Sequence, residues 1–167
     1  IWRRTFSGMD RAIVHSSTFH MGALAMTAGL AVLEVLDEER LASNAERIGG
    51  RIAKGLRAMA SRFEFIREIR QRGLMLAVEF KRPVSFGLRT GWDLVHAMDR
   101  NLFAQAVTMP LLADHRILCQ VAGHDQDTVK FTPPLTVNDS DASWLLDAFE
   151  RVMERLHRFP GPAFDVL

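Results

Sequence analysis

Two pairs of short strand-like segments constrain the fold more than any other feature of this sequence. Residues 65–70 and 74–80 form the first pair, with Gly73 between them, and residues 117–122 and 128–132 form the second. Strands joined by so short a connection pair antiparallel, because a parallel pair needs a long crossover. The other segments have helical patterns. The order of elements therefore predicts an α+β fold, with an antiparallel sheet and helices on one side of it.

Two helical segments precede the first strand, and we expect both to lie outside the α+β unit. Residues 21–36 are rich in Ala, Leu and Met on all sides, which predicts a buried helix. The acidic run 37–39 suits the first turn of the second helix. Gly49 and Gly50 lie inside that second helix, where each glycine lowers helix stability by about 1 kcal/mol relative to Ala. A close backbone contact would explain why both positions are glycine. Its apolar residues form one amphipathic stripe: Leu41, Ala45, Ile48, Ile52, Leu56, Met59 and Phe63.

The later segments are assigned in the same way. Pro83 ends a strand, and we expect residues 83–91 to form a loop and residues 92–107 to form a helix. A last helix follows, capped by Asp139 or Ser140.

Composition excludes several classes of protein. The 167 residues are 48% hydrophobic and carry a net charge of +1, so no overall field attracts nucleic acid or an anionic membrane. The longest uncharged stretch has too short an apolar part to cross a bilayer. The single cysteine, Cys119, excludes an internal disulfide and suits a reducing compartment, so we expect a cytoplasmic protein. The sequence does not begin with Met, and Trp2 and Phe6 lie outside any regular element, as expected for a segment cut from a longer chain.

Most residues that could bind a ligand or take part in catalysis have a simpler structural explanation. His115, Cys119 and His124 surround one strand, but their spacing matches no zinc pattern, so we expect no metal site. Cys119 has no histidine that the sequence places against it, and alternation favours a core position. Glycine-rich phosphate loops are absent. The basic residues 67–72 alternate, which sends their charges to both faces and indicates a solvated edge strand rather than a nucleic-acid surface.

Two places remain as candidate sites. Ser17 and Thr18 lie just before a helix, where hydroxyls and unpaired backbone N–H groups suit an anion. The alternative is that one of them caps the helix. Lys130 lies on a short strand ahead of Pro133 and Pro134, which holds its side chain in a defined direction. The alternative there is an exposed strand lysine.

Three segments, in order, resemble the carboxyl-terminal part of class III pyridoxal-phosphate-dependent aminotransferases, the family of the ornithine, acetylornithine, 4-aminobutyrate and putrescine enzymes. The first is residues 15–19 (HSSTF) running into residues 25–36, the second is residues 69–80, and the third is residues 129–137 (VKFTPPLTV). The resemblance implies the fold of type I cofactor enzymes. It divides the chain into the end of the large cofactor domain (1–36), a connecting helix (37–63) and a small α+β domain (64–167).

The resemblance also implies roles for individual residues. Thr18, with Ser17 beside it, aligns with the threonine that reaches the pyridoxal 5′-phosphate of the neighbouring subunit, which makes the functional unit a homodimer. Lys130 stands where members acting on amino acids often carry an arginine for the α-carboxylate. Lysine is a point charge without the bidentate fork of arginine, which leaves room for diamines and ω-amino substrates as amino donors to a keto acid. After the Thr–Phe pair the family often has Gly-Gly-Asn-Pro, whereas this chain has residues 20–23 (HMGA).

The lysine that holds the cofactor covalently in this family lies upstream of the first motif. None of Lys54, Lys81 and Lys130 lies in that context, so we assign no catalytic residue and expect the chain alone to be inactive. Two alternatives stay open. One is an aminomutase or decarboxylase of the same family, and the other is a non-catalytic α+β module for binding or dimerisation.

Overall fold

The chain divides into two compact units, Ile1–Arg40 and Leu41–Leu167. This computed structural model describes Gly8, Thr18 and residues 22–158. Helix α2 (Ala23–Glu38) belongs to the first unit, and the other described helices and strands belong to the second. In the described part of the chain, no helix is long and apolar enough to cross a membrane.

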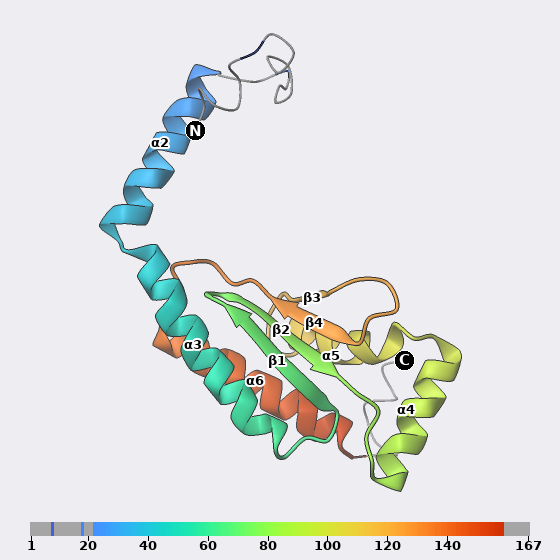
Figure 1. Cartoon of the computed structure of the whole chain (residues 1–167). Helices are drawn as coiled ribbons and strands as arrows, with labels where there is room; N and C mark the ends of the chain where they lie inside the picture. Colours follow the sequence, from blue (N-terminus) through green and yellow to red (C-terminus); the bar gives the residue numbers. More distant parts are fainter. Residues whose placement is uncertain (1–7, 9–17, 19–21, 159–167) are drawn as a thin grey trace. The chain divides into compact units, whose positions relative to one another are not determined.

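The second unit is built on a four-stranded antiparallel sheet (Figure 1). Its strands are β1 (Ile66–Arg72), β2 (Met75–Phe80), β3 (Gln120–Val121) and β4 (Thr128–Phe131). They lie in the order β1-β2-β4-β3, so β1 and β3 are the edge strands. The predicted α+β class and antiparallel sheet are confirmed. Strand β3 is shorter than the six residues expected, since only Gln120 and Val121 pair with β4.

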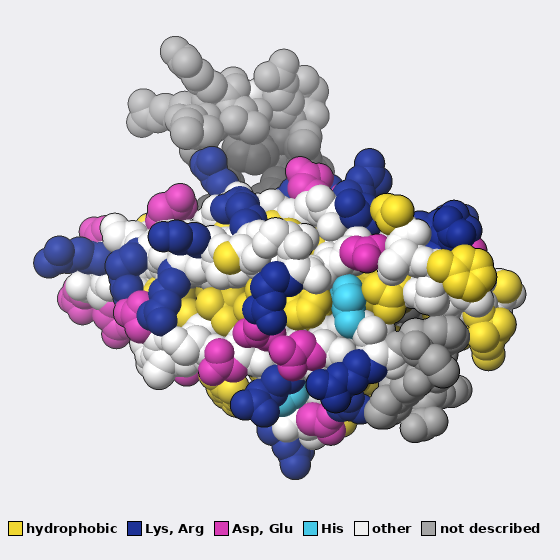
Figure 2. All heavy atoms as spheres, turned by 90° about the horizontal axis from the view of Figure 1, so that it is seen from below, with side chains coloured by type: hydrophobic (Ala, Val, Ile, Leu, Met, Phe, Trp, Pro, Cys, Tyr) yellow, Lys and Arg dark blue, Asp and Glu magenta, His cyan; other side chains and the backbone are white. Residues whose placement is uncertain are grey.

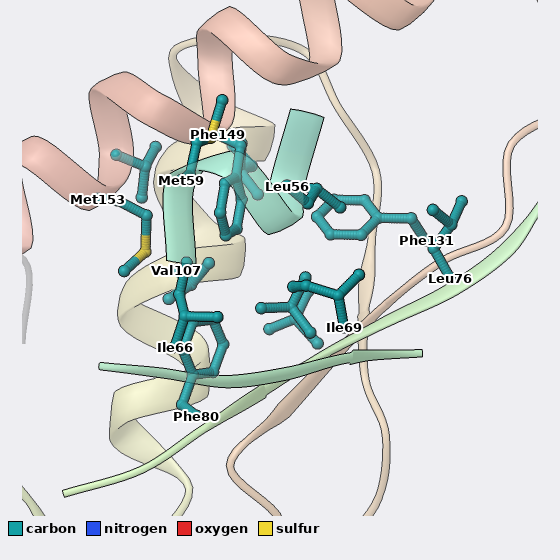
Figure 3. Close-up of a cluster of buried hydrophobic side chains, with 14 of the residues drawn as sticks. Leu56, Met59, Ile66, Ile69, Leu76, Phe80, Val107, Phe131, Phe149 and Met153 are labelled. Atoms are coloured by element: carbon teal, nitrogen blue, oxygen red, sulfur yellow. The ribbon is translucent and has the colours of Figure 1, made fainter. Parts of the chain in front are cut away.

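Three helices bury one face of this sheet. They are α3 (Leu41–Ala60), α5 (Leu102–Ala113) and α6 (Asp139–Leu156). Figure 3 shows their apolar side chains meeting those of the strands. The largest fully buried side chains are Phe131, Phe149, Ile48, Ile52, Leu56, Leu111, Met153, Val78, Val107, Val129 and Val152. Burial of this apolar area is the main stabilising contribution to the unit.

The sheet therefore has two unlike faces, because side chains alternate along a strand. On β2, Leu76, Val78 and Phe80 are buried, whereas the residues between them are exposed or half-buried. We call the side of Val78 the packed face. The opposite side, which carries Ala77 and its cross-strand neighbours, is the open face.

Helix α3 lies inside the α+β unit and not outside it, because its apolar stripe packs on β1 and α6. The predicted close backbone contact exists at one of its two glycines. A Cβ atom on Gly49 would lie 1.9 Å from the carbonyl oxygen of Gly73, which has a φ of +52° in the turn between β1 and β2. At Gly50 a Cβ atom would meet nothing within 4 Å, so no contact explains that glycine.

Helix α2 has the predicted extent but not the predicted burial. None of its residues is buried by the described chain, and Leu24, Leu30 and Leu33 are 86%, 62% and 62% exposed. The acidic residues Asp37 and Glu38 belong to the end of α2 rather than to the first turn of α3. Arg40, with a φ of +49°, separates the two helices.

The segment after β2 differs most from the prediction. Helix α4 (Phe86–Met98) begins inside the expected loop, and the expected single helix is interrupted at Asp99 before α5 begins. The carboxylate of Glu64 accepts the backbone N–H groups of Val84 and Ser85, at 2.9 Å each, which orders the chain just ahead of α4. Asp99 has extended backbone, and its side chain accepts the N–H of Asn101, so a turn replaces the helix there.

Helix α6 is capped by Asn138, and neither Asp139 nor Ser140 is the cap. The Asn138 side chain accepts the N–H groups of Ser140 and Asp141, and the Asp141 carboxylate accepts the N–H of Asn138 in return. Figure 2, seen from below, shows Lys and Arg side chains mixed with Asp and Glu over the outer surface of the unit. One such pair joins α3 to α6, with Arg47 Nη1 2.7 Å from Asp139 Oδ2.

Candidate functional site

Thr18 lies in a turn ahead of α2, and it is exposed. The N-cap of α2 is Gly22 and neither Ser17 nor Thr18, so the interpretation of either residue as the helix cap is wrong. Ser17 lies outside the described residues. Among the described residues no side chain caps α2, so backbone N–H groups of its first turn are the kind of donors that an anion such as a phosphate binds.

Lys130 lies in the middle of β4 on the open face. Its neighbours Val129 and Phe131 are buried on the packed face, and Lys130 is half-buried. The register pairs it with Ala77 of β2 on one side and Gln120 of β3 on the other. The hydrogen bonds of β4 to both β2 and β3 fix the backbone at Lys130. This supports the prediction that the Lys130 side chain is held in a defined direction. Thr18 belongs to the first unit and Lys130 to the second, so the structure describes each within its own unit.

A depression of about 460 Å³ lies beside Lys130 on the open face. Three cations line it, namely Lys130, Arg70 and Arg72, together with apolar and neutral residues. These other lining residues are Gln71, Met75, Leu76, Ala77 and Thr132. The lining contains no carboxylate, which makes this depression electropositive.

A second depression, of about 320 Å³, lies at the other end of β1 and β2, and its lining has mixed charge, with Arg67 and Arg70 beside three carboxylates. Its lining includes the carboxylates of Glu79, Asp125 and Asp127. Glu79 binds two arginines of β1, with Arg67 Nη1 2.9 Å from Oε1 and Arg70 Nη1 2.6 Å from Oε2. The expectation that residues 67–72 send their charges to both faces is wrong here, because the register shifts between Ile66 and Glu68 and both arginines reach Glu79. The prediction of an edge strand is confirmed.

Cys119 is half-buried and packs against the hydrophobic core, but it lies just before β3 and not in the strand. Burial raises the pKa of its thiol to about 11, so the thiol stays protonated near neutral pH and is a poor nucleophile. Among the described residues, no group of three or more His, Cys, Asp and Glu side chains lies close enough to hold a metal ion.

Sequence reasoning missed the network that holds α4. The Glu64 N–H donates to His157 Nε2 at 3.2 Å, and His157 Nδ1 lies 3.0 Å from the carbonyl oxygen of Met153. The pKa of Glu64 is lowered, chiefly by the hydrogen bond from the Ser85 N–H, and burial lowers the pKa of His157. No local pattern marks these contacts, because they join residues 20 and 93 positions apart.

A second missed pair joins α4 to the loop ahead of β4. His96 Nε2 lies 3.0 Å from each carboxylate oxygen of Asp127, and the His96 ring stacks on Trp92 with centroids 4.2 Å apart. Both networks fix the elements around the sheet and contribute no residue to the depression beside Lys130.

Comparison with known proteins decides the family. The sequence model of the class-III aminotransferase family matches residues 3–153. This chain is a class-III aminotransferase family member.

Curated and structural relatives agree with the family assignment. The chain is 30% identical over 139 residues to the ornithine aminotransferase of Oceanobacillus iheyensis, covering 83% of the chain and 29% of that protein. It is 30% identical to the diaminobutyrate–2-oxoglutarate aminotransferase of Rhizobium meliloti, covering 86% of the chain and 30% of that protein. The crystal structure of ornithine aminotransferase from Toxoplasma gondii superposes with a TM-score of 0.66 at 28% identity, covering 86% of the chain and 30% of that structure.

The chain spans less than a third of the length of these relatives. An amine transaminase from an uncultivated Pseudomonas species, solved in its PLP-bound form, has a TM-score of 0.69 at 24% identity and supports the fold. The family thus explains the fold of this chain. The signal that could have located the electropositive depression was the spacing of Arg70 and Arg72, two residues apart on one strand and therefore on the same face of the sheet.

Proposed function

We propose that this chain is the carboxyl-terminal segment of a pyridoxal-phosphate-dependent class III aminotransferase, which moves an amino group from an amine or ω-amino acid to a keto acid. The observation that carries the proposal is the family match over residues 3–153, together with Lys130 on the rim of an electropositive depression. When bound, pyridoxal phosphate supplies an electron sink for bonds to the carbon that bears the amino group.

The roles of the chain's own residues follow from their chemistry. Thr18, with Ser17 beside it, would bind the cofactor phosphate of a neighbouring subunit, since hydroxyl and N–H donors ahead of α2 suit a dianion. A site shared in this way requires a homodimer, and the absence of the cofactor-binding lysine assigns the covalent step to another part of the protein. Lys130 would bind the carboxylate of a substrate as a point charge. We propose a cytoplasmic location for this enzyme.

The decisive experiment measures keto-acid-dependent consumption of amines by the full-length protein. In that protein, Thr18→Ala should weaken pyridoxal phosphate binding by about 1–3 kcal/mol, the usual value for a hydrogen bond to a charged group. Thr27→Ala is the matched control, because the Thr27 hydroxyl donates to the Ala23 carbonyl within α2. Unchanged cofactor affinity in Thr18→Ala would favour a binding or dimerisation module without catalysis.

The isolated chain provides an independent test of the missing lysine. Mixed with pyridoxal phosphate, it should show no absorbance band of a covalent lysine adduct. A band that disappears in Lys130→Ala would contradict the proposal that the covalent attachment lies elsewhere.

A further inference from the structure

One side of helix α4 is apolar and exposed. Phe86, Leu94 and Met98 are 77%, 53% and 67% exposed, and Val84, just before the helix, is 81% exposed. The spacing of the three helical residues places them on one side of α4, whereas the opposite side, which carries Trp92, is buried. We call Val84, Phe86, Leu94 and Met98 the outer face of α4. A group of exposed apolar side chains of this kind is typical of an interaction surface.

The described part of the chain ends beside the start of this helix. Arg158 is its last residue, and the ring of the preceding residue, His157, accepts the N–H of Glu64 at 3.2 Å. The carboxylate of Glu64 in turn accepts the N–H groups of Val84 and Ser85, at 2.9 Å each. A single residue, Glu64, therefore bridges the end of α6 and the first residue of the outer face.

The residues after Arg158 have a composition that suits an apolar surface. Residues 159–167 (FPGPAFDVL) are almost all apolar, and Asp165 is their only charged side chain. Pro160 and Pro162 disfavour continuation of α6 and favour extended backbone.

The length of this segment also matches the helix. At about 3.3 Å per residue, residues 159–167 reach at most about 30 Å when extended. Helix α4 has 13 residues and is therefore about 20 Å long. The segment is long enough to follow the outer face from Val84 to Met98.

The tether favours this segment over other occupants of the outer face. A second copy of the chain, or another protein, binds according to its concentration in solution. A segment that is joined to the same molecule within reach of the surface has an effective concentration in the millimolar range, so a weak apolar contact is sufficient.

We propose that residues 159–167 pack on the outer face of α4, with their apolar side chains covering Phe86, Leu94 and Met98. The contact joins the end of α6 to α4 beside the Glu64–His157 network, and it removes the outer face from contact with other proteins. The inference is independent of the proposed function, because it involves neither the cofactor nor a substrate.

The test measures the proximity of the segment to the helix in the full 167-residue chain. A nitroxide spin label is attached to Asp165→Cys in a Cys119→Ser background, so that the label has a single site of attachment. We expect the backbone amide NMR signals of residues 86–98 to lose intensity. The signals of residues 41–47 should keep their intensity, because Arg47 contacts Asp139 at the opposite end of α6.

Two substitutions and a matched control identify the contact. Phe86→Asp should lower the ratio of docked to undocked segment about tenfold or more, since one buried Phe side chain contributes that much. The α4 signals should then recover, and Phe164→Asp should have the same effect from the other side of the contact. The control is Leu118→Asp, because Leu118 is 79% exposed and lies outside α4, and it should leave the loss of intensity unchanged.

A mixing experiment separates this contact from one between two copies. Isotope-labelled chain without nitroxide is mixed with spin-labelled chain without the isotope, and the α4 signals should keep their intensity. Loss of intensity in the mixture would mean that a second copy supplies the segment, which overturns the proposal. The proposal is also overturned if the spin-labelled chain itself shows no loss at residues 86–98, or if Leu118→Asp restores the signals as fully as Phe86→Asp does.

Discussion

The two faces of the sheet are made from the same four strands but serve different purposes. On the packed face, Val78, Val129 and Phe131 are at most 1% exposed and meet helices α3, α5 and α6. On the open face, Ala77 and Lys130 occupy the alternate positions of the same strands and border a hollow that water can enter. On β4, residues that stabilise the fold therefore alternate with a residue that lines the hollow. Substitutions at adjacent positions should then affect different properties, either the free energy of unfolding or ligand binding.

The largest expected difference is between Phe131 and Lys130, which are neighbours on β4. Phe131→Ala should lower the free energy of unfolding by about 3–5 kcal/mol, because it leaves a cavity against Phe149. Lys130→Ala should change it by no more than about 0.5 kcal/mol. Urea unfolding followed by circular dichroism measures both, and equal losses would mean that the two faces are not distinct.

The next largest effect compares Gly49 with Gly50 on α3. Gly49→Ala places a methyl group against the carbonyl oxygen of Gly73, and the backbone cannot yield there as a side chain would, so we expect a loss of about 1–3 kcal/mol. Gly50→Ala meets nothing and should stabilise the helix by about 0.5–1 kcal/mol. Thermal unfolding of the two variants provides the measurement. A destabilising Gly50→Ala would show that α3 is packed on a second side.

A smaller loss is expected at the start of α6, which supports the packed face from outside. Asn138→Ala removes the side-chain acceptor for two backbone N–H groups and should cost about 1 kcal/mol. Ser140→Ala is the control, because the Ser140 hydroxyl only donates to Asn138 and accepts no orphan N–H group of the helix. Similar losses in both variants would contradict the assignment of Asn138 as the cap.

The smallest expected effect is a dependence on pH at His157, which joins α6 to Glu64. Burial lowers the pKa of His157 in the folded chain below its ordinary value of 6.5. The folded state thus binds fewer protons than the unfolded state, so this stabilising contribution is present above pH 6.5 and is lost as the pH falls through the lowered pKa. His157→Phe keeps the aromatic contacts with Phe63 and Phe65 and should reduce this dependence.

The measurement is the free energy of unfolding between pH 7 and the acid limit of the transition. Substitution of His124, whose side chain is 85% exposed, serves as the comparison and should leave the dependence unchanged. If His157→Phe retains the full dependence on acid, another group is responsible for it.

Local sequence patterns determined the elements and the class of fold. The stripe on α3, the alternation on β2 and the closeness of the strand pairs are short-range features, and a helix or strand depends on them directly. The same patterns placed Lys130 on a strand. They also placed Gly49 inside a helix, where a close backbone contact was the expected reason for a glycine. The family resemblance of residues 129–137 pointed to Lys130 as a candidate binding residue.

Tertiary structure decided what each element touches. Pattern alone predicted burial for the apolar helix α2, yet its leucines are exposed within the described chain, because burial depends on a partner and not on composition. The β-bulge between Ile66 and Glu68 turned Arg67 and Arg70 toward one carboxylate, and the hydrogen bonds of Glu64 moved the start of α4. The electropositive depression exists only because the register of three strands brings Arg72 and Lys130 to the same face, and register is set by pairing between segments that are far apart in the sequence.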